Sequence, residues 1–375
     1  MLNNQKTRDV ITQALLVSGV AIALIYCALR IRYAVQAQGM VSGFGFLDRS
    51  TGWDISFSVL EYSISETYAR VILIGLLNTI YSGVISIVGA TIIGALVGLA
   101  RLSPNYLLRS AGATYVNFFR NIPLILQIIF WYQIIGHLPH PRQALDIGGI
   151  FFLSNRGLYW PVLHLANWAG WAILALFFVT LVGVSLRTRM LGGVSFTRKK
   201  FFALGLLTIL LVAFLGTIGQ ENAWDVPHLA GLNIKGGAVL QPELCALVVA
   251  IWLYGGAYIG EVVRSGFMSV RKGQTEAARS LGLRRFHIFS RIQLPLAIRA
   301  MLPTLSNQYI LLMKSTTLGI AIGFSEFFFV ISTSINQSGQ TLELLGILMV
   351  GFLTVNLCIG FGMNWLNVRL ALKGK

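Results

Sequence analysis

The chain has 375 residues, of which 55% are hydrophobic and 11% are charged, and its mean hydropathy is +0.73. Soluble domains carry about a quarter charged residues, so the composition excludes an ordinary soluble protein. Several apolar runs of about 18 residues or more could each cross roughly 30 Å of hydrocarbon as a helix. The alternating segments of about ten residues that a transmembrane barrel requires are not found in the sequence. We therefore expect an all-α, polytopic membrane protein.

The formal net charge of +16 could indicate nucleic acid as a partner, but the distribution of the charges argues against it. Basic residues alternate with the apolar runs, and most of them lie in five segments: 1–9, 101–120, 187–201, 261–300 and 369–375. Cytoplasmic loops of membrane proteins carry an excess of Lys and Arg. We therefore place these segments and both termini in the cytoplasm, and we expect no nucleic-acid partner.

The apolar runs predict about eight transmembrane spans, at roughly 10–29, 71–100, 122–136, 171–186, 201–218, 244–260, 300–324 and 345–366. The first run is longer than the roughly 7–15 apolar residues of a signal peptide, so we expect a retained anchor. Small residues such as Gly75 and Gly94 in the second span would let helices approach closely in a bilayer. The three cysteines lie in apolar runs, which argues against a disulfide framework or a metal cluster, and we expect no cofactor.

The most informative motif lies in the basic segment 261–300. Glu276-Ala277-Ala278 is followed after three residues by Gly282, and nine further residues lead to Ile292-Gln-Leu294-Pro295. This spacing resembles the EAA loop of permease subunits in ATP-binding-cassette importers. In that family the loop forms a short helix that docks on the ATPase subunit. The alternative is an amphipathic linker helix without a partner.

The resemblance extends beyond this loop. Gly273-Gln274-x-Glu276-Ala277-Ala278 is similar to the variant of the motif found in polar amino-acid permeases. Three further segments resemble that family: Gly75-Leu-Leu-Asn78-Thr79, Phe119-Arg120-Asn121-Ile122-Pro123-Leu124 and Lys314-Ser315-Thr316-Thr317-Leu318. Asn121 and Ile122 depart from the family's usual Gly-Thr. Together the matches cover about 71–137 and 243–368, and they imply the five-helix core of type I (MetI-like) ABC importers.

The resemblance also implies a division of the chain. We expect an anchor helix with an exported segment (1–70), two parts of the permease core (71–137 and 243–368), an insertion with two extra spans (138–242) and a cytoplasmic tail (369–375). This plan is similar to the larger permease of general L-amino-acid and glutamate/glutamine/aspartate/asparagine importers. The partners implied are an ABC ATPase subunit, a second EAA-bearing permease in a heterodimer, a periplasmic solute-binding protein, an amino-acid substrate and the lipid of a bacterial inner membrane.

The sequence contains no Gly-rich P-loop ending in Gly-Lys-Ser/Thr, so we expect ATP hydrolysis on a partner chain and no catalytic role here. The residues expected to couple the two chains are Gly273, Gln274, Glu276, Ala277, Ala278, Leu281, Gly282 and Phe286. Near a helix start, Glu276 would complement the helix dipole. Gly282 would permit a sharp turn or a close approach of backbones. Leu281 and Phe286, together with Phe289, would supply apolar anchors for a groove.

A second candidate site lies in the seventh span. Lys314 is the only ionisable residue well inside a predicted span, and an intramembrane charge is a functional candidate by default. Asn307 lies seven residues earlier and therefore on the same helix face. The candidate residues of a translocation path are Gln127, Asn307, Lys314, Ser315, Thr316 and Glu326. A polar contact between helices of the permease would account for them equally well.

Two other function classes remain for comparison. An ion-gradient-driven secondary transporter or channel would work without an ATPase, and such proteins usually carry acidic residues near mid-span, which this chain lacks. A membrane enzyme would need a catalytic cluster at a membrane face, and none is evident. His137 and His140 form an HxxH pair without a nearby carboxylate, which is a weak metal signal.

Overall fold

The computed structural model describes residues 5–37, 43–163 and 224–370, together with scattered positions between 172 and 217. The chain divides into two compact units. The helical unit consists of Met1–Trp131 and Ala246–Lys375, and the strand unit of Tyr132–Cys245. Most of the predicted spans 171–186 and 201–218 falls outside the described residues.

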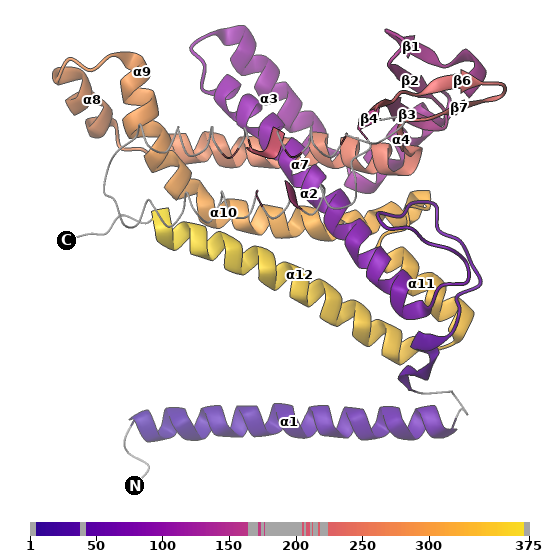
Figure 1. The fold of residues 1–375 in the computed structure, drawn as a ribbon. Coiled ribbons are helices and arrows are strands. Elements are labelled where there is room, and N and C mark those ends of the chain that lie inside the picture. Colours follow the sequence, from indigo (N-terminus) through magenta and orange to yellow (C-terminus); the bar gives the residue numbers. More distant parts are fainter. Residues whose placement is uncertain are drawn as a thin grey trace. The chain divides into compact units, whose positions relative to one another are not determined.

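Helices make up most of the described chain (Figure 1). The α-helices are α1 (Gln5–Ala37), α2 (Tyr68–Arg101), α3 (Tyr106–Asn121), α4 (Leu124–Gly136), α7 (Pro242–Met268), α8 (Lys272–Ser280), α9 (Arg285–Ile288), α10 (Leu294–Ser315), α11 (Phe327–Ser338) and α12 (Thr341–Leu370). Shorter pieces are the 3-10 helices η1 (Phe44–Asp48), η2 (Pro141–Gln143) and η4 (Thr316–Ile322), and the π-helical turn η3 (Phe289–Gln293).

Three described helices, α2, α7 and α12, are long and apolar enough to cross a membrane. They coincide with the predicted spans at 71–100, 244–260 and 345–366. Two bent pairs raise the number of candidates among the described residues to five: α3 with α4, bent by 100°, and Arg285–Ile322 with α11, bent by 50°. The predicted third span is α4, whose 13 residues reach only about 20 Å, and it is a candidate for crossing only when counted together with α3.

The glycines of α2 serve helix packing, as the sequence predicts. A Cβ on Gly75 would lie 2.9 Å from a methyl of Val330 on α11, and a Cβ on Gly94 would lie 2.6 Å from Ile259 on α7. The indole of Trp252 lies against Gly89, where its Nε1 donates to the Ile85 carbonyl at 2.9 Å. Backbone approach at these glycines lets α2 pack against α7 along one part of its length and α11 along another.

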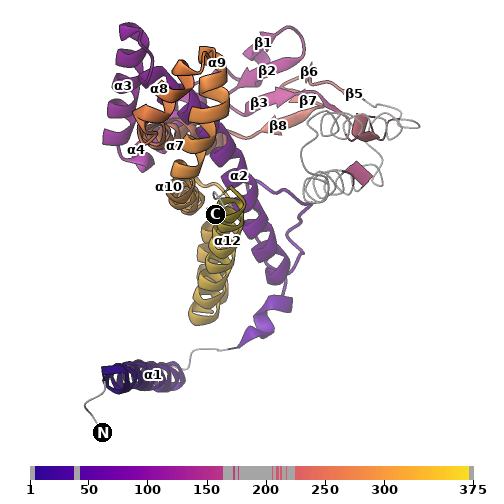
Figure 2. The ribbon, with the colours of Figure 1, turned by 90° about the vertical axis from the view of Figure 1, so that its left-hand side faces the viewer.

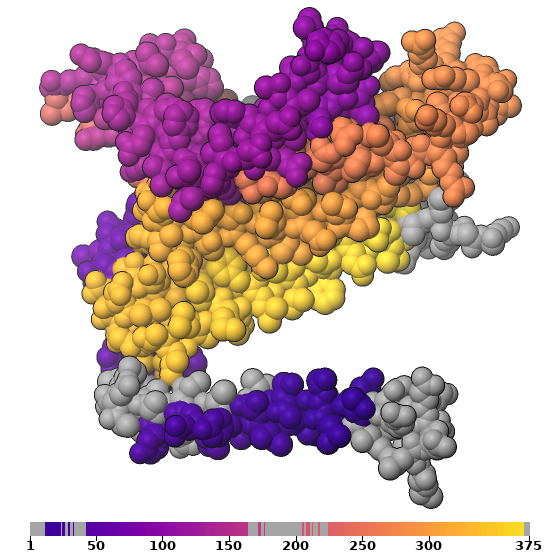
Figure 3. All heavy atoms as spheres, turned by 180° about the vertical axis from the view of Figure 1, so that it is seen from behind, coloured from indigo at the N-terminus to yellow at the C-terminus, as the bar shows by residue number. Residues whose placement is uncertain are grey.

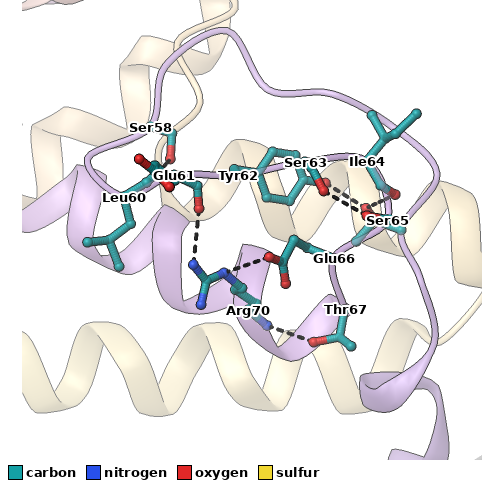
Figure 4. Close-up of polar contacts among 11 residues, drawn as sticks. Ser58, Leu60, Glu61, Tyr62, Ser63, Ile64, Ser65, Glu66, Thr67 and Arg70 are labelled. Atoms are coloured by element: carbon teal, nitrogen blue, oxygen red, sulfur yellow. Dashed lines mark hydrogen bonds and ion pairs between the residues drawn. The ribbon is translucent and has the colours of Figure 1, made fainter.

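The segment before α2 caps the N-terminus of that helix and packs against its first turns. Thr67 is the N-cap, and its hydroxyl accepts a hydrogen bond from the Arg70 amide at 3.4 Å. The Arg70 side chain pairs with Glu66 at 3.4 Å and donates to the Glu61 carbonyl at 3.1 Å (Figure 4). Nearby, Phe46 of η1 is buried in an apolar cluster built from α2, α11 and α12. The segment from η1 to Thr67 is thus folded onto the helices and is not a free linker.

The strand unit corrects the prediction of an all-α chain. Four strands, β1 (Leu145–Ile147), β2 (Phe151–Ser154), β3 (Gly157–Trp160) and β8 (Ala238–Leu240), form an antiparallel sheet in the order β1-β2-β3-β8. Figure 2 shows the four strands in that succession. Two small pairs join β4 (Val162–Leu163) to β5 (Trp224–Asp225) and β6 (His228–Ala230) to β7 (Asn233–Lys235). Strands of two to four residues are too short for a clear alternating pattern, which is why hydropathy did not predict them.

Candidate functional site

The connection between α7 and α10 carries the motif that the sequence singles out. Helix α7 continues to Met268, so the first eight residues of the predicted loop, starting at Glu261, extend the sixth predicted span. The name EAA loop is therefore kept for residues 269–293, which form α8, a turn, α9 and η3. Its orange atoms form a projection in the space-filling view (Figure 3). The predicted docking helix is α8.

Gly282 closes α8 by a left-handed turn. Its φ is +74°, and the hydrogen bonds have the Schellman pattern: the Gly282 amide donates to Arg279 O at 2.9 Å, and the Leu283 amide donates to Ala278 O at 3.2 Å. Apart from its two chain neighbours, no atom of the described residues would lie within 4 Å of a Cβ on Gly282. Of the two predicted roles, the described structure therefore supports the sharp turn and offers no close backbone approach within this chain.

The two faces of α8 differ in exposure. Ala278 is buried against the rest of the loop, whereas Glu276 and Ala277 are exposed. Glu276 is the fifth residue of α8, and the first turn contains no acidic residue. The expectation that Glu276 complements the dipole at the helix start is therefore wrong, because α8 begins one turn earlier, at Lys272.

Large apolar side chains point away from the EAA loop at its tip. Leu281 is 80% exposed and Phe286 is 73% exposed, although both are large and apolar. Phe289, the third predicted anchor, is half-buried and stacks on Phe267 at the end of α7, with ring centroids 5.5 Å apart and planes 5° from parallel. The outward anchors are thus Leu281 and Phe286, while Phe289 joins the loop to α7. Gly273 and Gln274 lie exposed in the first turn of α8.

Glu261 ties two helices together at the base of the loop. It pairs with Arg264 one turn further along α7, with Arg264 Nε donating at 3.1 Å. It also pairs with Arg101, the last residue of α2. Sequence reasoning did not find Arg101, because a contact across 160 positions leaves no local signal.

Asn307 and Lys314 share the exposed face of α10. Both side chains are exposed, and the exposed residues Pro303 and Leu311 lie on the same stripe. Ser315 is half-buried and donates to the Leu311 carbonyl at 2.9 Å. Thr316 is fully buried, and its hydroxyl donates to the Met313 carbonyl at 2.8 Å, where α10 tightens into η4.

The other two candidates for the path, Gln127 and Glu326, hydrogen-bond to backbone groups. Gln127 is buried, and its Nε2 donates to the carbonyls of Phe119 and Ile122, each at 3.0 Å. It therefore holds the bend between α3 and α4. Glu326 is fully buried as the N-cap of α11, where its carboxylate accepts from the amides of Phe328 at 2.7 Å and Phe329 at 2.8 Å. Neither shares the exposed stripe of α10.

A polar junction that sequence reasoning missed lies at the break between α10 and α11. Asn78 of α2 is fully buried, and its Nδ2 donates to the carbonyls of Phe57 at 2.9 Å and Ser325 at 2.7 Å. Its Oδ1 accepts from the Val59 amide at 3.1 Å. Asn78 thus joins the segment before α2, α2 itself and the helix break. The motif Gly75-Leu-Leu-Asn78-Thr79 was the available signal, although it indicated family and not this contact.

The HxxH pair of the strand unit does not converge on one point. His137 Nδ1 lies 2.7 Å from the Gln133 carbonyl, whereas His140 Nδ1 lies 3.1 Å from Asn155 Nδ2. Among the described residues, no group of three or more His, Cys, Asp or Glu side chains is arranged to hold a metal ion. The pair is accounted for by these separate contacts.

Comparison with known proteins gives the family. Residues 201–371 match the binding-protein-dependent transport system inner membrane component family. The chain is 39% identical to the putative amino-acid ABC transporter permease protein YhdX of Escherichia coli (strain K12) over 341 residues, covering 89% of this chain and 87% of YhdX. It is 36% identical to the general L-amino acid transport system permease protein AapQ of Rhizobium johnstonii over 336 residues, covering 88% and 84%. The chain belongs to the amino-acid ABC transporter permeases.

A third relative and a solved structure are less similar in sequence. The glutamate/glutamine/aspartate/asparagine transport system permease protein BztB of Rhodobacter capsulatus is 29% identical over 375 residues, covering 90% of this chain and 88% of BztB. A crystal structure of an amino acid ABC transporter with histidines aligns with a TM-score of 0.48 at 17% identity, covering 80% of this chain and 95% of that chain. The protein is thus a membrane-embedded permease component of an ABC amino-acid transporter.

Proposed function

We propose that this chain forms the translocation path of an ATP-driven, binding-protein-dependent L-amino-acid importer in a bacterial inner membrane, and that its EAA loop couples the path to a separate ATPase subunit. The main support for this coupling is the exposure of Leu281 and Phe286 at the tip of that loop. Two large apolar side chains held in water beside a rigid turn favour a partner's groove. The amino-acid substrate is supported by the functions that the names of YhdX, AapQ and BztB state.

The proposed coupling runs through the contacts of the loop. Movement of a docked α8 would reach α7 through the stack of Phe289 on Phe267. It would reach α10 through η3, which continues directly into that helix. Glu261 would pass the displacement of α7 to α2 through Arg101. Gly273, Gln274, Glu276, Ala277, Ala278 and Gly282 would shape the docking surface and its turn.

The proposed path runs along the exposed stripe of α10. An amino acid carries a carboxylate and an ammonium group, and Lys314 and Asn307 offer a cation and an amide on one face. Ser315 and Thr316 would support this face through their hydrogen bonds to α10 carbonyls. Gln127 and Glu326 would shape the path indirectly, by holding the bend between α3 and α4 and the start of α11. A second, related EAA-bearing permease in a heterodimer would close the path on its open side.

The remaining features of the proposal concern assembly. We infer about eight spans, both termini in the cytoplasm, an insertion at 138–242 between two parts of the core, and a periplasmic solute-binding protein that delivers the substrate. ATP would be hydrolysed by the ATPase subunit alone. The ion-gradient-driven carrier remains the competing hypothesis, and a double substitution at the loop tip separates the two.

The test replaces both tip anchors, as Leu281→Ser/Phe286→Ser, and measures ATPase recovery on purification together with ATP-dependent uptake. We expect the complex to lose the ATPase subunit and uptake to fall at least about tenfold, since interface hot spots are worth roughly 2 kcal/mol or more each. A matched control, Leu96→Ser/Phe361→Ser, changes a leucine 64% exposed and a phenylalanine 69% exposed on α2 and α12. ATPase retention in the tip variant, or uptake driven by an ion gradient without any ATPase, would contradict the proposal.

A further inference from the structure

A cavity of about 470 Å³ opens where the end of α7, the start of α8 and the first turns of α10 come together. Its lining includes Ser269, Arg271, Gln274, Leu296 and Arg299. Neither aspartate nor glutamate is among the lining residues. Two arginines therefore line one hollow that contains no carboxylate to balance their charge.

Arg299 makes this cavity more than a gap between helices. Its Nε is shielded from solvent and makes no hydrogen bond to the part of the chain that the structure describes. The ion pairs among the described residues include neither Arg271 nor Arg299. Two cationic side chains in one hollow, without a carboxylate among its lining residues, create a positive potential that favours an anion.

The planar shape of the guanidinium groups favours an oxyanion as the ligand. A guanidinium presents its N–H groups in a planar fork that matches two oxygens of a phosphate. The amide of Gln274 adds a further hydrogen-bonding group to the wall. A group with several acceptor oxygens would engage both arginines at once, whereas chloride would not use the fork.

Apolar surface beside the cavity points to the source of that oxyanion. Met268 is 64% exposed and Ile298 is 37% exposed, and each is next in sequence to a lining residue. Both belong to helices that are candidates for crossing the membrane. Basic pockets between membrane helices suit anionic headgroups, with acyl chains against the adjoining apolar side chains.

We propose that this cavity is a binding site for a phosphate group, presented by an anionic phospholipid headgroup or free in solution, with Arg271 and Arg299 as its ligands. The site is formed in part by the first residues of the EAA loop, including Arg271 and Gln274, but it uses none of the exposed tip anchors. Its occupant would join α8 to α10 through the two arginines. The inference does not depend on the coupling role of Leu281 or Phe286.

The test is a native mass spectrometry titration of the complex, purified in mild detergent, with short-chain phosphatidylglycerol and, separately, phosphatidylcholine. We expect one phosphatidylglycerol to bind preferentially, and its dissociation constant to rise at least about tenfold in Arg271→Gln/Arg299→Gln, since hydrogen bonds to charged groups are strong. The matched control Arg109→Gln/Arg291→Gln removes two exposed arginines outside the cavity and should bind like the wild type.

Competition distinguishes the two sources. Millimolar inorganic phosphate that displaces the lipid, at an ionic strength where chloride does not, would identify free phosphate as the occupant. Lipid that resists this competition would identify the headgroup. Should the glutamine variant fail to fold, Arg271→Lys/Arg299→Lys keeps the charge, loses the fork and should still weaken binding. Equal binding of lipid and of phosphate by wild type and a folded cavity variant would overturn the proposal.

Discussion

Among single residues, Gly282 is where backbone geometry constrains the EAA loop most. Its left-handed conformation ends α8 and turns the chain so that Leu281 and Phe286 both face outward. The space around Gly282 is open within this chain, so a side chain there would meet no neighbouring atom. Substitutions at Gly282 can therefore show whether the loop requires the left-handed turn or requires empty space next to a partner.

We expect Gly282→Asn to retain most uptake, Gly282→Ala to lose more of it, and Gly282→Val to abolish it. The left-handed region costs most residues about 1–2 kcal/mol, asparagine less and β-branched residues more. ATP-dependent uptake in membrane vesicles, normalised to permease abundance, gives the ranking. If asparagine is as harmful as valine, the open space rather than the turn is what the loop requires.

Lys314 carries the second prediction at this scale. We expect Lys314→Gln to reduce amino-acid uptake at least about tenfold while the ATPase still copurifies, because the substrate carboxylate would lose its cation. Lys314→Arg should recover part of the uptake, and Asn336→Gln, an exposed change on α11, should have no effect. Normal uptake by Lys314→Gln would show that the exposed stripe of α10 does not line the translocation path.

Between helices, the break from α10 to α11 depends on contacts that neither helix makes alone. Gly323 ends η4 with φ +76°, Glu326 caps α11, and Asn78 holds the Ser325 carbonyl from α2. The Ser56 amide donates to Ser325 Oγ at 3.0 Å, which adds the segment before α2 to the same junction. The bend of 50° is thus stabilised from two sides by elements distant in the sequence.

We expect Asn78→Ala to destabilise the protein by about 1–3 kcal/mol per group left unsatisfied, because it strands the Val59 amide and two carbonyls. The measurement is the melting temperature in detergent, together with protease cleavage near residues 56–60. Asn336→Ala, on the exposed surface of α11, serves as the control and should leave both unchanged. An unaltered melting temperature in Asn78→Ala would show that the junction contributes nothing to stability.

For the molecule as a whole, small residues decide how closely the candidate spans pack. Gly94 lies against Ile259 with no space for a side chain, whereas a Cβ on Gly360 of α12 would meet no other helix among the described residues within 4 Å. The two glycines have similar sequence surroundings, each in a long apolar helix, yet one is enclosed and the other is open.

Gly94→Leu should therefore push α2 away from α7 and lower the amount of folded permease in membranes severalfold, as overpacking typically costs about 1–3 kcal/mol or more. Gly360→Leu adds the same volume in open space and should be tolerated. Membrane abundance and monodispersity on size exclusion provide the comparison. Equal tolerance of both changes would mean that the α2 and α7 backbones do not need this approach.

The sequence by itself determined the helical membrane class, three long candidate spans, the packing role of the α2 glycines and the EAA motif, while for Gly282 it left a turn and a close backbone approach open. Each rests on composition, on run length or on residues close together along the chain, so no tertiary information is needed. The motif resemblance indicated the family on the same basis, and the relatives bear it out.

Tertiary structure decided the rest. The strands of 145–240 are too short to leave a pattern, and the ties from Glu261 to Arg101 and from Asn78 to Ser325 join positions far apart. Only packing determines which side chains remain outside: it buried Gln127, Thr316 and Glu326 and left Asn307, Lys314, Leu281 and Phe286 exposed. Exposure depends on what neighbouring elements cover, and a linear sequence does not contain that information.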